Sequence, residues 1–361
     1  MSRADPRVGC LYICVLQLYY IMRRKVVSHT LPLFGDAVSP DQSVGNGVQQ
    51  TSEYIERNRN RLRRWASKGI LFGTSSWKYP GWKGVIYNRR YPSKRALEQE
   101  CLAEYSELFP TVCADFALYD FPRSEKMQIM HDQTSNDFRI SLKVTDRITI
   151  KRYPNLPRYG PNAGHENPDF LNIELFEDAF LKPIEALKKK RGAIIFEFST
   201  FHSNSGITYE KFVEMIDGFL SRLPREYEYA VEIRNREFLT DEYLRMLESR
   251  GVAHVLNNWT RMPPIIEQIQ IAGVLTGRFS VARALLKAGR TYEEAVELFQ
   301  PYENIKEENP DLRMGLAEAV QRCVAEGRTL YAYVNNRAEG NSPKTIEAIL
   351  DILDRYPVEK L

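Results

Sequence analysis

Short runs in which apolar and polar residues alternate recur along the chain after Gly69. Such alternation is typical of β-strands, because successive side chains of a strand point to opposite faces. The pattern predicts eight strands, over residues 70–75, 112–117, 138–144, 193–199, 228–234, 252–257, 273–279 and 329–335.

Longer segments between these strands carry apolar residues every three to four positions, as one face of a helix does. In one of them, Leu97, Cys101, Leu102, Tyr105 and Leu108 share a face. This periodicity predicts helices over residues 94–108, 124–132, 171–190, 209–220, 241–250, 292–299, 312–325 and 345–353.

Eight strands that alternate with helices predict an α/β fold, a (β/α)8 TIM barrel with an N-terminal extension. A doubly wound open sheet is the alternative, but it normally shows a glycine-rich phosphate turn after its first strand. The residues that follow here, Gly73-Thr74-Ser75-Ser76-Trp77, are not G-x-G-x-x-G, and no G-x-x-x-x-G-K-[ST] loop occurs. We therefore expect no nucleotide cofactor. The long connections at residues 145–170 and 258–272 are expected to cover the barrel mouth.

The same alternation predicts which side chains face the barrel lumen near the C-terminal ends of the strands, where barrel enzymes place their chemistry. They are Asp115, Lys143, Glu197, Glu232, Arg234, Asn257, Arg278 and Asn335. A balanced ion-pair network that only fixes strand register is one interpretation. Burying six charges for stability is inefficient, because desolvation commonly cancels the Coulomb gain. We therefore favour a functional site.

The chain has 361 residues and a net charge of +3, but the basic surplus lies in residues 1–68, with 11 Lys+Arg against 5 Asp+Glu. The remainder is close to neutral, which disfavours a nucleic-acid-binding body. The composition predicts two parts: residues 1–68, an extension that is largely disordered or a basic helix, and residues 69–361, the barrel domain.

An apolar run at residues 8–22 precedes Arg23, Arg24 and Lys25, and it is short for a membrane span of about 20 residues. A short signal anchor stays open, although a membrane partner is not expected. The five cysteines are scattered without a C-x-x-C pair, which indicates a reducing compartment and a cytoplasmic location.

Several ordered motifs resemble the YecE-like family, domain of unknown function 72. They are residues 72–87 (beginning Phe72-Gly73-Thr74-Ser75-Ser76-Trp77), residues 115–122, the strand ending at Lys143, Phe196-Glu197-Phe198, residues 231–235 and residues 334–343. The resemblance covers most of residues 70–350 and implies a TIM barrel related to sugar isomerases. The chain departs from the common family pattern at Glu197, where many members carry glutamine, and at Tyr119, in a variant of the usual Phe-Tyr pair.

The leading hypothesis is an enzyme that acts on a sugar-like or polyhydroxylated small molecule by isomerase-type proton transfer. Glu232 would be the general base, its pKa set by Arg234 and Lys143, and Arg278 would hold an anionic or carbonyl oxygen. Asn257, Asn335 and Asn336 would bind hydroxyl groups. Trp77, Tyr79 and Trp82 would form an aromatic wall for a sugar ring or, equally, plug the barrel top. A divalent metal on Asp115, Glu197 and Glu232 would allow a hydride shift instead.

Three alternatives stay open. A glycoside hydrolase would use Glu197 as acid and Glu232 as nucleophile. A Schiff-base lyase would use Lys143 with a depressed pKa. A non-catalytic or nucleic-acid-associated protein would use the basic extension, with Tyr54 and Trp65 near phosphates. The substrate, the use of a metal and the oligomeric state do not follow from the sequence.

Overall fold

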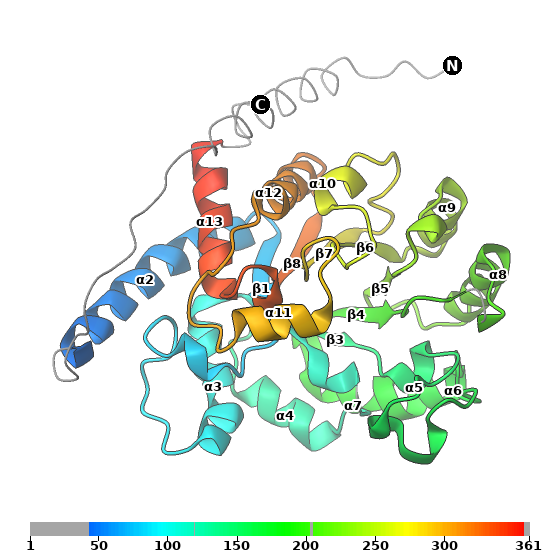
Figure 1. The fold of residues 1–361 in the computed structure, drawn as a ribbon, viewed down its shortest axis with the longest axis horizontal. Coiled ribbons are helices and arrows are strands. Elements are labelled where there is room, and N and C mark those ends of the chain that lie inside the picture. The colour runs from blue at the N-terminus through cyan, green and yellow to red at the C-terminus, as the bar shows by residue number, and fades with distance from the viewer. Residues whose placement is uncertain (1–42, 119, 203–204, 357–361) are drawn as a thin grey trace.

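A computed structural model describes residues 43–118, 120–202 and 205–356 of the chain. Its eight parallel strands form a closed barrel, in which each strand pairs with the next and β8 closes on β1 (Figure 1). The strands are β1 (Ile70–Thr74), β2 (Thr111–Ala114), β3 (Arg139–Lys143), β4 (Arg191–Glu197), β5 (Tyr229–Glu232), β6 (Ala253–Asn257), β7 (Phe279–Ala284) and β8 (Thr329–Val334). The fold is therefore the predicted (β/α)8 TIM barrel.

Helices form the outer layer around this barrel, as Figure 1 shows. The longer ones are α2 (Ser43–Ala66), α3 (Lys94–Leu108), α4 (Ser124–Asp132), α8 (Tyr209–Leu220), α9 (Asp241–Arg250), α11 (Tyr292–Phe299), α12 (Pro310–Ala325) and α13 (Ser342–Arg355). Short helical segments are η1 (Pro80–Trp82), η2 (Asp115–Leu118), α5 (Asp146–Thr149), η3 (Pro157–Asn162), α6 (Ile173–Phe176), η4 (Glu177–Leu181), α7 (Lys182–Ile184), η5 (Glu185–Lys190), η7 (Arg236–Phe238), α10 (Ile265–Gln268) and η8 (Asn336–Ala338).

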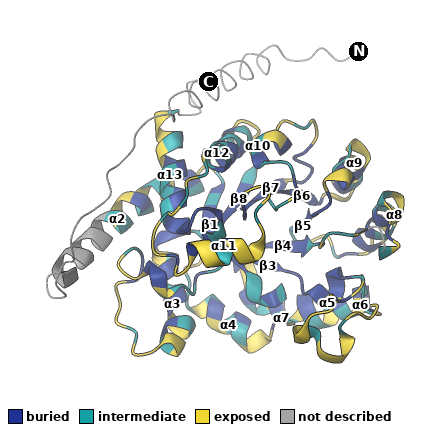
Figure 2. Cartoon of the chain, in the orientation of Figure 1, coloured by how far each residue is buried: buried dark blue, intermediate teal, exposed yellow. Residues whose placement is uncertain are grey.

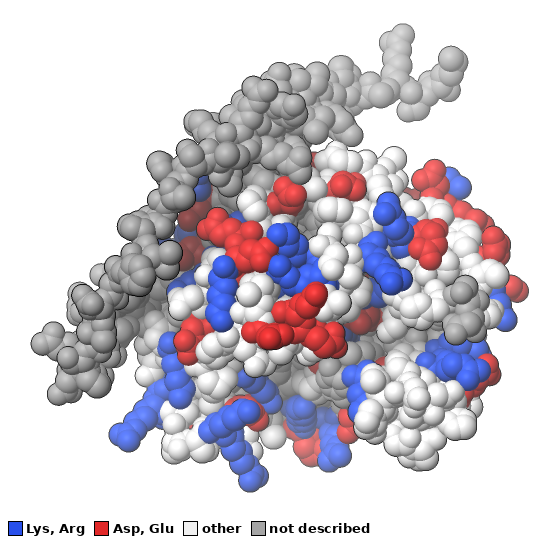
Figure 3. Space-filling view, viewed as in Figure 1, with Lys and Arg blue, Asp and Glu red and all other residues white. Residues whose placement is uncertain are grey.

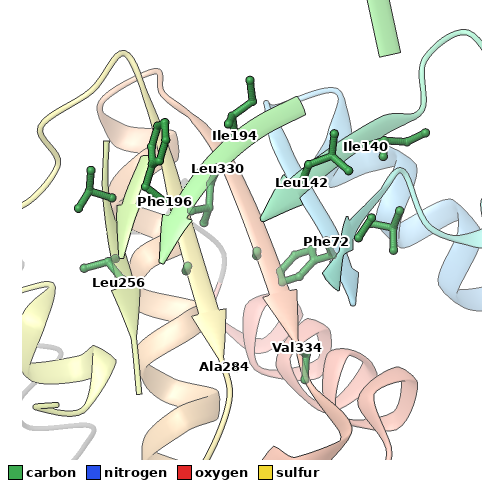
Figure 4. Packing of buried hydrophobic residues seen from close by; sticks show 14 of the residues in the cluster. Phe72, Ile140, Leu142, Ile194, Phe196, Leu256, Ala284, Leu330 and Val334 are labelled. Carbon is green, nitrogen blue, oxygen red and sulfur yellow. The ribbon is translucent and has the colours of Figure 1, made fainter. Parts of the chain in front are cut away.

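Alternation along the strands divides the core into two parts. Outward-facing side chains such as Phe72, Leu142 and Phe196 pack under the helices (Figure 4). Inward-facing residues form a separate cluster in the lumen, which includes Ile195 and Tyr333. The strands are buried on both faces, whereas the outer faces of the helices are exposed (Figure 2).

Glycine is required at one point of the barrel wall. A Cβ added to Gly73 of β1 would lie 2.1 Å from the carbonyl oxygen of Thr111 in β2. Any other residue would push these two strands apart.

Helix α2 packs beside α13 along one edge of the barrel (Figure 1). Its Leu62 and Trp65 are buried in the core, and Arg61 forms ion pairs with Asp351 and Asp354, both at 2.7 Å. Within the described residues, no helix combines the length and the apolarity needed to cross a membrane. The apolar run 8–22 lies outside the described residues.

Two sequence predictions differ from the structure. The seventh strand is Phe279–Ala284 rather than 273–279. The predicted helix over residues 171–190 is a series of four short segments, α6, η4, α7 and η5, in which Lys188 adopts a left-handed conformation with φ of 52°. Pro183 also removes a backbone donor within this segment.

Helix α11 belongs to the long connection between β7 and β8, so it follows the C-terminal end of a strand, and it crosses the barrel in Figure 1. Phe299, together with Tyr302 just after the helix, forms a small apolar cluster against which Tyr79 and Trp259 pack. Acidic side chains gather where α11 crosses the barrel (Figure 3), and Glu293, Glu294 and Glu297 of this helix are exposed. Helix α11 thus covers part of the C-terminal mouth.

Candidate active site

Side chains from the C-terminal ends of β3, β4, β5 and β7, and from the start of η2, converge in the lumen. Glu232 ends β5, and its carboxylate pairs with Arg234 at 2.6 Å and with Arg283 of β7. Glu197 ends β4, and its Oε2 lies 3.0 Å from Arg234 and 3.0 Å from Arg283. Two guanidiniums, those of Arg234 and Arg283, therefore bridge the two glutamates.

The buried Lys143 and the partly exposed Asp115 complete the cluster. The ammonium of Lys143, at the end of β3, lies 2.8 Å from Oε2 of Glu197 and 3.9 Å from Oδ1 of Asp115. Asp115 begins η2, directly after β2, and its Oδ1 is 3.5 Å from Arg283. We call these six residues the rim cluster: Asp115, Lys143, Glu197, Glu232, Arg234 and Arg283.

Exposure within the rim cluster decreases with depth. The side chain of Asp115 is 25% exposed, that of Glu197 is 14% exposed and that of Glu232 is fully buried. A ligand that enters from the mouth therefore meets Asp115 first and cannot touch Glu232 without displacing other groups.

Neighbouring charges determine the protonation states of Glu197 and Lys143. Burial alone would raise the pKa of Glu197, but Arg234, Lys143 and Arg283 hold this pKa well below its usual range. Burial alone would lower the pKa of Lys143, but Glu197 and Asp115 raise it above the ordinary lysine value. Glu197 is thus a carboxylate and Lys143 an ammonium near neutral pH.

A polar layer supports the rim cluster from below. The hydroxyl of Tyr333 donates a hydrogen bond to Oγ of Ser141 at 2.6 Å and lies 3.0 Å from Oγ1 of Thr111. Cys113 lies beneath Asp115, with Sγ 3.9 Å from Oδ1, and burial raises the pKa of its thiol to about 12. The thiol is therefore neutral and unsuited to act as a nucleophile.

Two of the three residues predicted to form an aromatic wall, Trp77 and Trp82, are buried and close the top of the barrel. Trp82 is fully buried between Tyr87 and Tyr105, and its Nε1 donates to Oδ1 of Asn336 at 3.3 Å. Trp77 is buried as well, whereas Tyr79 stays partly exposed. Of the three predicted residues, Tyr79 alone retains surface that a ligand could reach.

A different aromatic residue reaches the cluster. The ring of Trp259, in the connection after β6, lies 4.1 Å from the guanidinium carbon of Arg234. Trp259 is partly exposed, so its ring separates the buried cluster from solvent on one side. The sequence pattern does not predict Trp259, because this residue lies after β6, where the alternation of apolar and polar side chains has ended.

The three predicted asparagines are buried and bind the protein itself. Asn257 donates to the backbone carbonyls of Ile233 and Val255, and the Asn335 side chain accepts from the backbone amide of Arg337. Asn336 accepts from both the backbone amide and the hydroxyl of Ser342. They shape the loops at the mouth, and binding of substrate hydroxyl groups by these side chains stays a prediction.

The prediction of Arg278 is wrong. Arg278 precedes β7 at the opposite end of the barrel and is exposed. Arg283 occupies the position in the lumen that the sequence pattern predicts for Arg278, because β7 begins six residues later than the predicted strand. Applied to the correct strand, the same alternation puts Phe279, Val281 and Arg283 in the lumen.

The connection after β3 supplies a further carboxyl group that the sequence did not single out. Asp146 follows Lys143 closely, and the hydroxyl of Tyr159 donates to its Oδ2 at 2.8 Å. Burial raises the pKa of Asp146 above its usual value. Asn167 holds this connection in place through hydrogen bonds to the carbonyls of Arg147 and Ile150.

Comparison of the sequence with models of known protein families identifies the family of this chain. A family model described as "Protein of unknown function DUF72" matches residues 71–360. The chain belongs to the DUF72 family. No curated protein matches it.

Solved DUF72 structures share the fold. A DUF72 family protein from Enterococcus faecalis V583 is 16% identical with a TM-score of 0.53, over 78% of this chain and 95% of that one. A DUF72 family protein from Thermotoga maritima MSB8 is 18% identical with a TM-score of 0.51, over 79% of this chain and 98% of that one. At such identities the likeness supports the barrel and says nothing of a reaction. The variant position Tyr119 lies outside the described residues.

The rim cluster of this DUF72 protein does not fit a divalent cation. Across the described ranges, no group of three His, Cys, Asp or Glu side chains is arranged to hold a metal ion. The physical reason is that Arg283 and Lys143 already lie between the carboxylates of Asp115, Glu197 and Glu232. A metal-assisted hydride shift at these three residues therefore has no support in this donor set.

Proposed function

We propose that the protein is an enzyme that acts on a small, sugar-like or polyhydroxylated molecule at the C-terminal rim of the barrel, by proton transfer beside a carbonyl group. The observation that carries the proposal is the pair nearest the mouth, the partly exposed carboxylate of Asp115 beside the buried, protonated amine of Lys143 at 3.9 Å. Proton abstraction next to a carbonyl needs these two partners, a base and a donor that stabilises the oxygen of the resulting enediolate.

The burial gradient assigns different roles to the carboxylates. Asp115 is the most exposed and the least tightly paired, so it is the candidate base. Lys143 would donate to the substrate oxygen, and Glu197 would hold Lys143 charged and in position. Glu232, the base expected from the sequence, would instead be a positioning residue that anchors Arg234 and Arg283. A base and a donor to the carbonyl oxygen are the two groups that isomerisation by proton transfer needs, so these roles are consistent with the resemblance to sugar isomerases.

The geometry is less favourable to the alternative reactions. A two-carboxylate glycosidase needs one carboxyl group that stays protonated, whereas the pKa of Glu197 is lowered and Arg283 fills the space between Glu197 and Glu232. A Schiff-base mechanism at Lys143 needs a depressed amine pKa, and this pKa is raised.

Nucleic-acid binding by the basic extension is also less favourable. Tyr54 packs against the core, and Trp65 is buried in it. Arg57, Arg61 and Arg64 form ion pairs with acidic residues of α13 and are not free for phosphates.

Two broader predictions belong to the same proposal. We place the boundary between extension and barrel domain near Gly69, because the family match begins at residue 71. We also propose a cytoplasmic location, since the described cysteines Cys101, Cys113 and Cys323 are buried free thiols.

Solvent deuterium exchange tests the reaction across many candidate substrates at once. The full chain is incubated in D2O with a panel of aldoses and ketoses, and proton NMR follows the hydrogen on the carbon beside the carbonyl. We expect exchange in at least one sugar, and we expect Asp115→Asn to slow it by about 100-fold or more. Asp120→Asn, an exposed carboxylate five residues away, is the matched control and keeps the rate. Exchange at the full rate in Asp115→Asn, or at none of the sugars, would contradict the proposal.

A further inference from the structure

A second cavity lies outside the barrel, next to the rim cluster but separated from it by η2. Its volume is about 590 Å³, a size that suits a small organic molecule. The lining residues are Phe116, Asp120, Phe121, Arg123, Glu125, Lys126 and Ile129. Asp115 and Phe116 are consecutive in η2, and the first reaches the rim cluster while the second lines this α4 cavity.

Lys126 is the only lysine among the residues that line the α4 cavity, and its amine is half-enclosed. Its Nζ lies 3.1 Å from the centroid of the Phe116 ring, a cation–π contact that by itself favours the ammonium but leaves no room for water between the two groups. No hydrogen bond or ion pair of Lys126 is found within the described residues. The residue lies in the first turn of α4, where the helix dipole disfavours a positive charge.

Burial is the main influence that favours the neutral form of Lys126, and the neighbouring charges act in both directions. Burial lowers the pKa of Lys126 from 10.5 to about 8, Lys78 and Arg123 lower it further, and Asp120 opposes them. Glu125 also lines the cavity. At about pH 7.5 roughly a quarter of such an amine is unprotonated, against about one part in a thousand for an ordinary lysine.

We propose that Lys126 is a reactive amine that forms an imine with a small aromatic aldehyde bound in the α4 cavity. The nitrogen lone pair attacks the aldehyde carbon, and the carbonyl oxygen takes up the proton released from nitrogen. The resulting carbinolamine then loses its oxygen as water, which leaves a C=N bond with no net oxidation or reduction. This site is independent of the reaction proposed for the rim cluster.

The cavity walls indicate the class of aldehyde. Phe116, Phe121 and Ile129 provide apolar contact for an aromatic ring. Arg123 is largely exposed, and its nearest carboxylate, that of Asp120, is 4.0 Å away. Its guanidinium is thus available for an anionic substituent on the ring.

Reductive trapping tests the proposal with para-carboxybenzaldehyde as the probe. The full chain is incubated with the probe and sodium cyanoborohydride, which reduces the imine to a stable amine, and peptide mass spectrometry locates the label. The internal control is Lys94, an exposed lysine in the first turn of α3 that pairs with Glu98 at 3.8 Å. Mapping also separates Lys126 from the terminal amine.

We expect labelling of Lys126 to be at least about tenfold faster than that of Lys94 at about pH 7.5, with a midpoint near pH 8. Labelling no faster than at Lys94, or a midpoint near 10, would overturn the proposal. Uncharged benzaldehyde should label Lys126 more slowly than the probe, and Arg123→Gln should remove that difference. Equal rates for the two aldehydes in the unmodified protein would overturn the role of Arg123.

Discussion

Two lysines lie on either side of η2, and their surroundings move their pKa values in opposite directions. Lys143 lies in the lumen between Glu197 and Asp115, and its pKa is raised above the ordinary value. Lys126 lies against Phe116 outside the barrel, and its pKa is lowered to about 8. Burial disfavours the ammonium at both sites, so the carboxylates account for the difference.

The comparison distinguishes two roles for a lysine, a fixed charge that orients a substrate and an amine that acts as a nucleophile. In the rim cluster, mutual pairing keeps Glu197 and Lys143 charged, which suits a preorganised field that orients a substrate. In the α4 cavity, the amine lacks a carboxylate partner within the described residues and changes state near physiological pH, which suits nucleophilic chemistry.

The largest expected effect concerns the pairing in the rim cluster. Arg283→Met leaves Glu232 buried with one cation fewer, and removal of one partner from a buried pair costs about 3–5 kcal/mol. We expect the free energy of unfolding in urea at neutral pH to fall by about that amount. Arg278→Met, an exposed arginine just before the same strand, is the control and should change stability by less than about 0.5 kcal/mol. Equal losses in the two variants would show that the cluster is not held by Arg283.

The same pair of arginines shows where sequence analysis succeeds and where it fails. Seven strands lie mostly within their predicted ranges, because their outward residues are large and apolar, as with Ile194 and Phe196 of β4, whereas β7 shares only Phe279 with its range. In β7 the outward residues are Ser280, Ala282 and Ala284, which pack close to α12 and give little apolar signal. The larger apolar pair Val274-Leu275 upstream therefore attracts the prediction, and Arg278 is placed in the lumen with it.

Most charged members of the rim cluster could be predicted, but their roles could not. The alternation along each strand predicts Asp115, Lys143, Glu197, Glu232 and Arg234. Which face of a strand a side chain points to depends only on its position in that strand, so it can be inferred from the local sequence. Burial depends on what covers each residue. The fully buried state of Glu232 and the enclosure of Trp82 by α3 and η8 arise from contacts between distant parts of the chain.

A smaller effect concerns the pH dependence that Lys126 contributes to stability. Its pKa is about 8 in the folded chain and about 10.4 in an unfolded one, so between these values the unfolded chain binds more protons. Stability therefore rises with pH across this window. Allowing for solvent screening at a half-exposed group, we expect a rise of about 1–2 kcal/mol relative to Lys126→Met. Urea unfolding of both proteins at about pH 7 and pH 10 measures it, and a difference that does not change with pH would rule it out.

The smallest expected effect isolates the contribution of a single neighbouring charge to that pKa. Lys78 lowers the pKa of Lys126, so Lys78→Gln should raise it by a few tenths of a unit, because exposed charges interact by about 1 kcal/mol or less. The midpoint of reductive labelling at Lys126 measures the change, and added salt should shrink it. Lys83→Gln, an exposed lysine in the same connection that does not act on Lys126, should leave the midpoint in place. If Lys78→Gln also leaves the midpoint unchanged, burial alone accounts for the lowered pKa of Lys126. The contrast with Lys143 then comes only from the carboxylates that pair with Lys143.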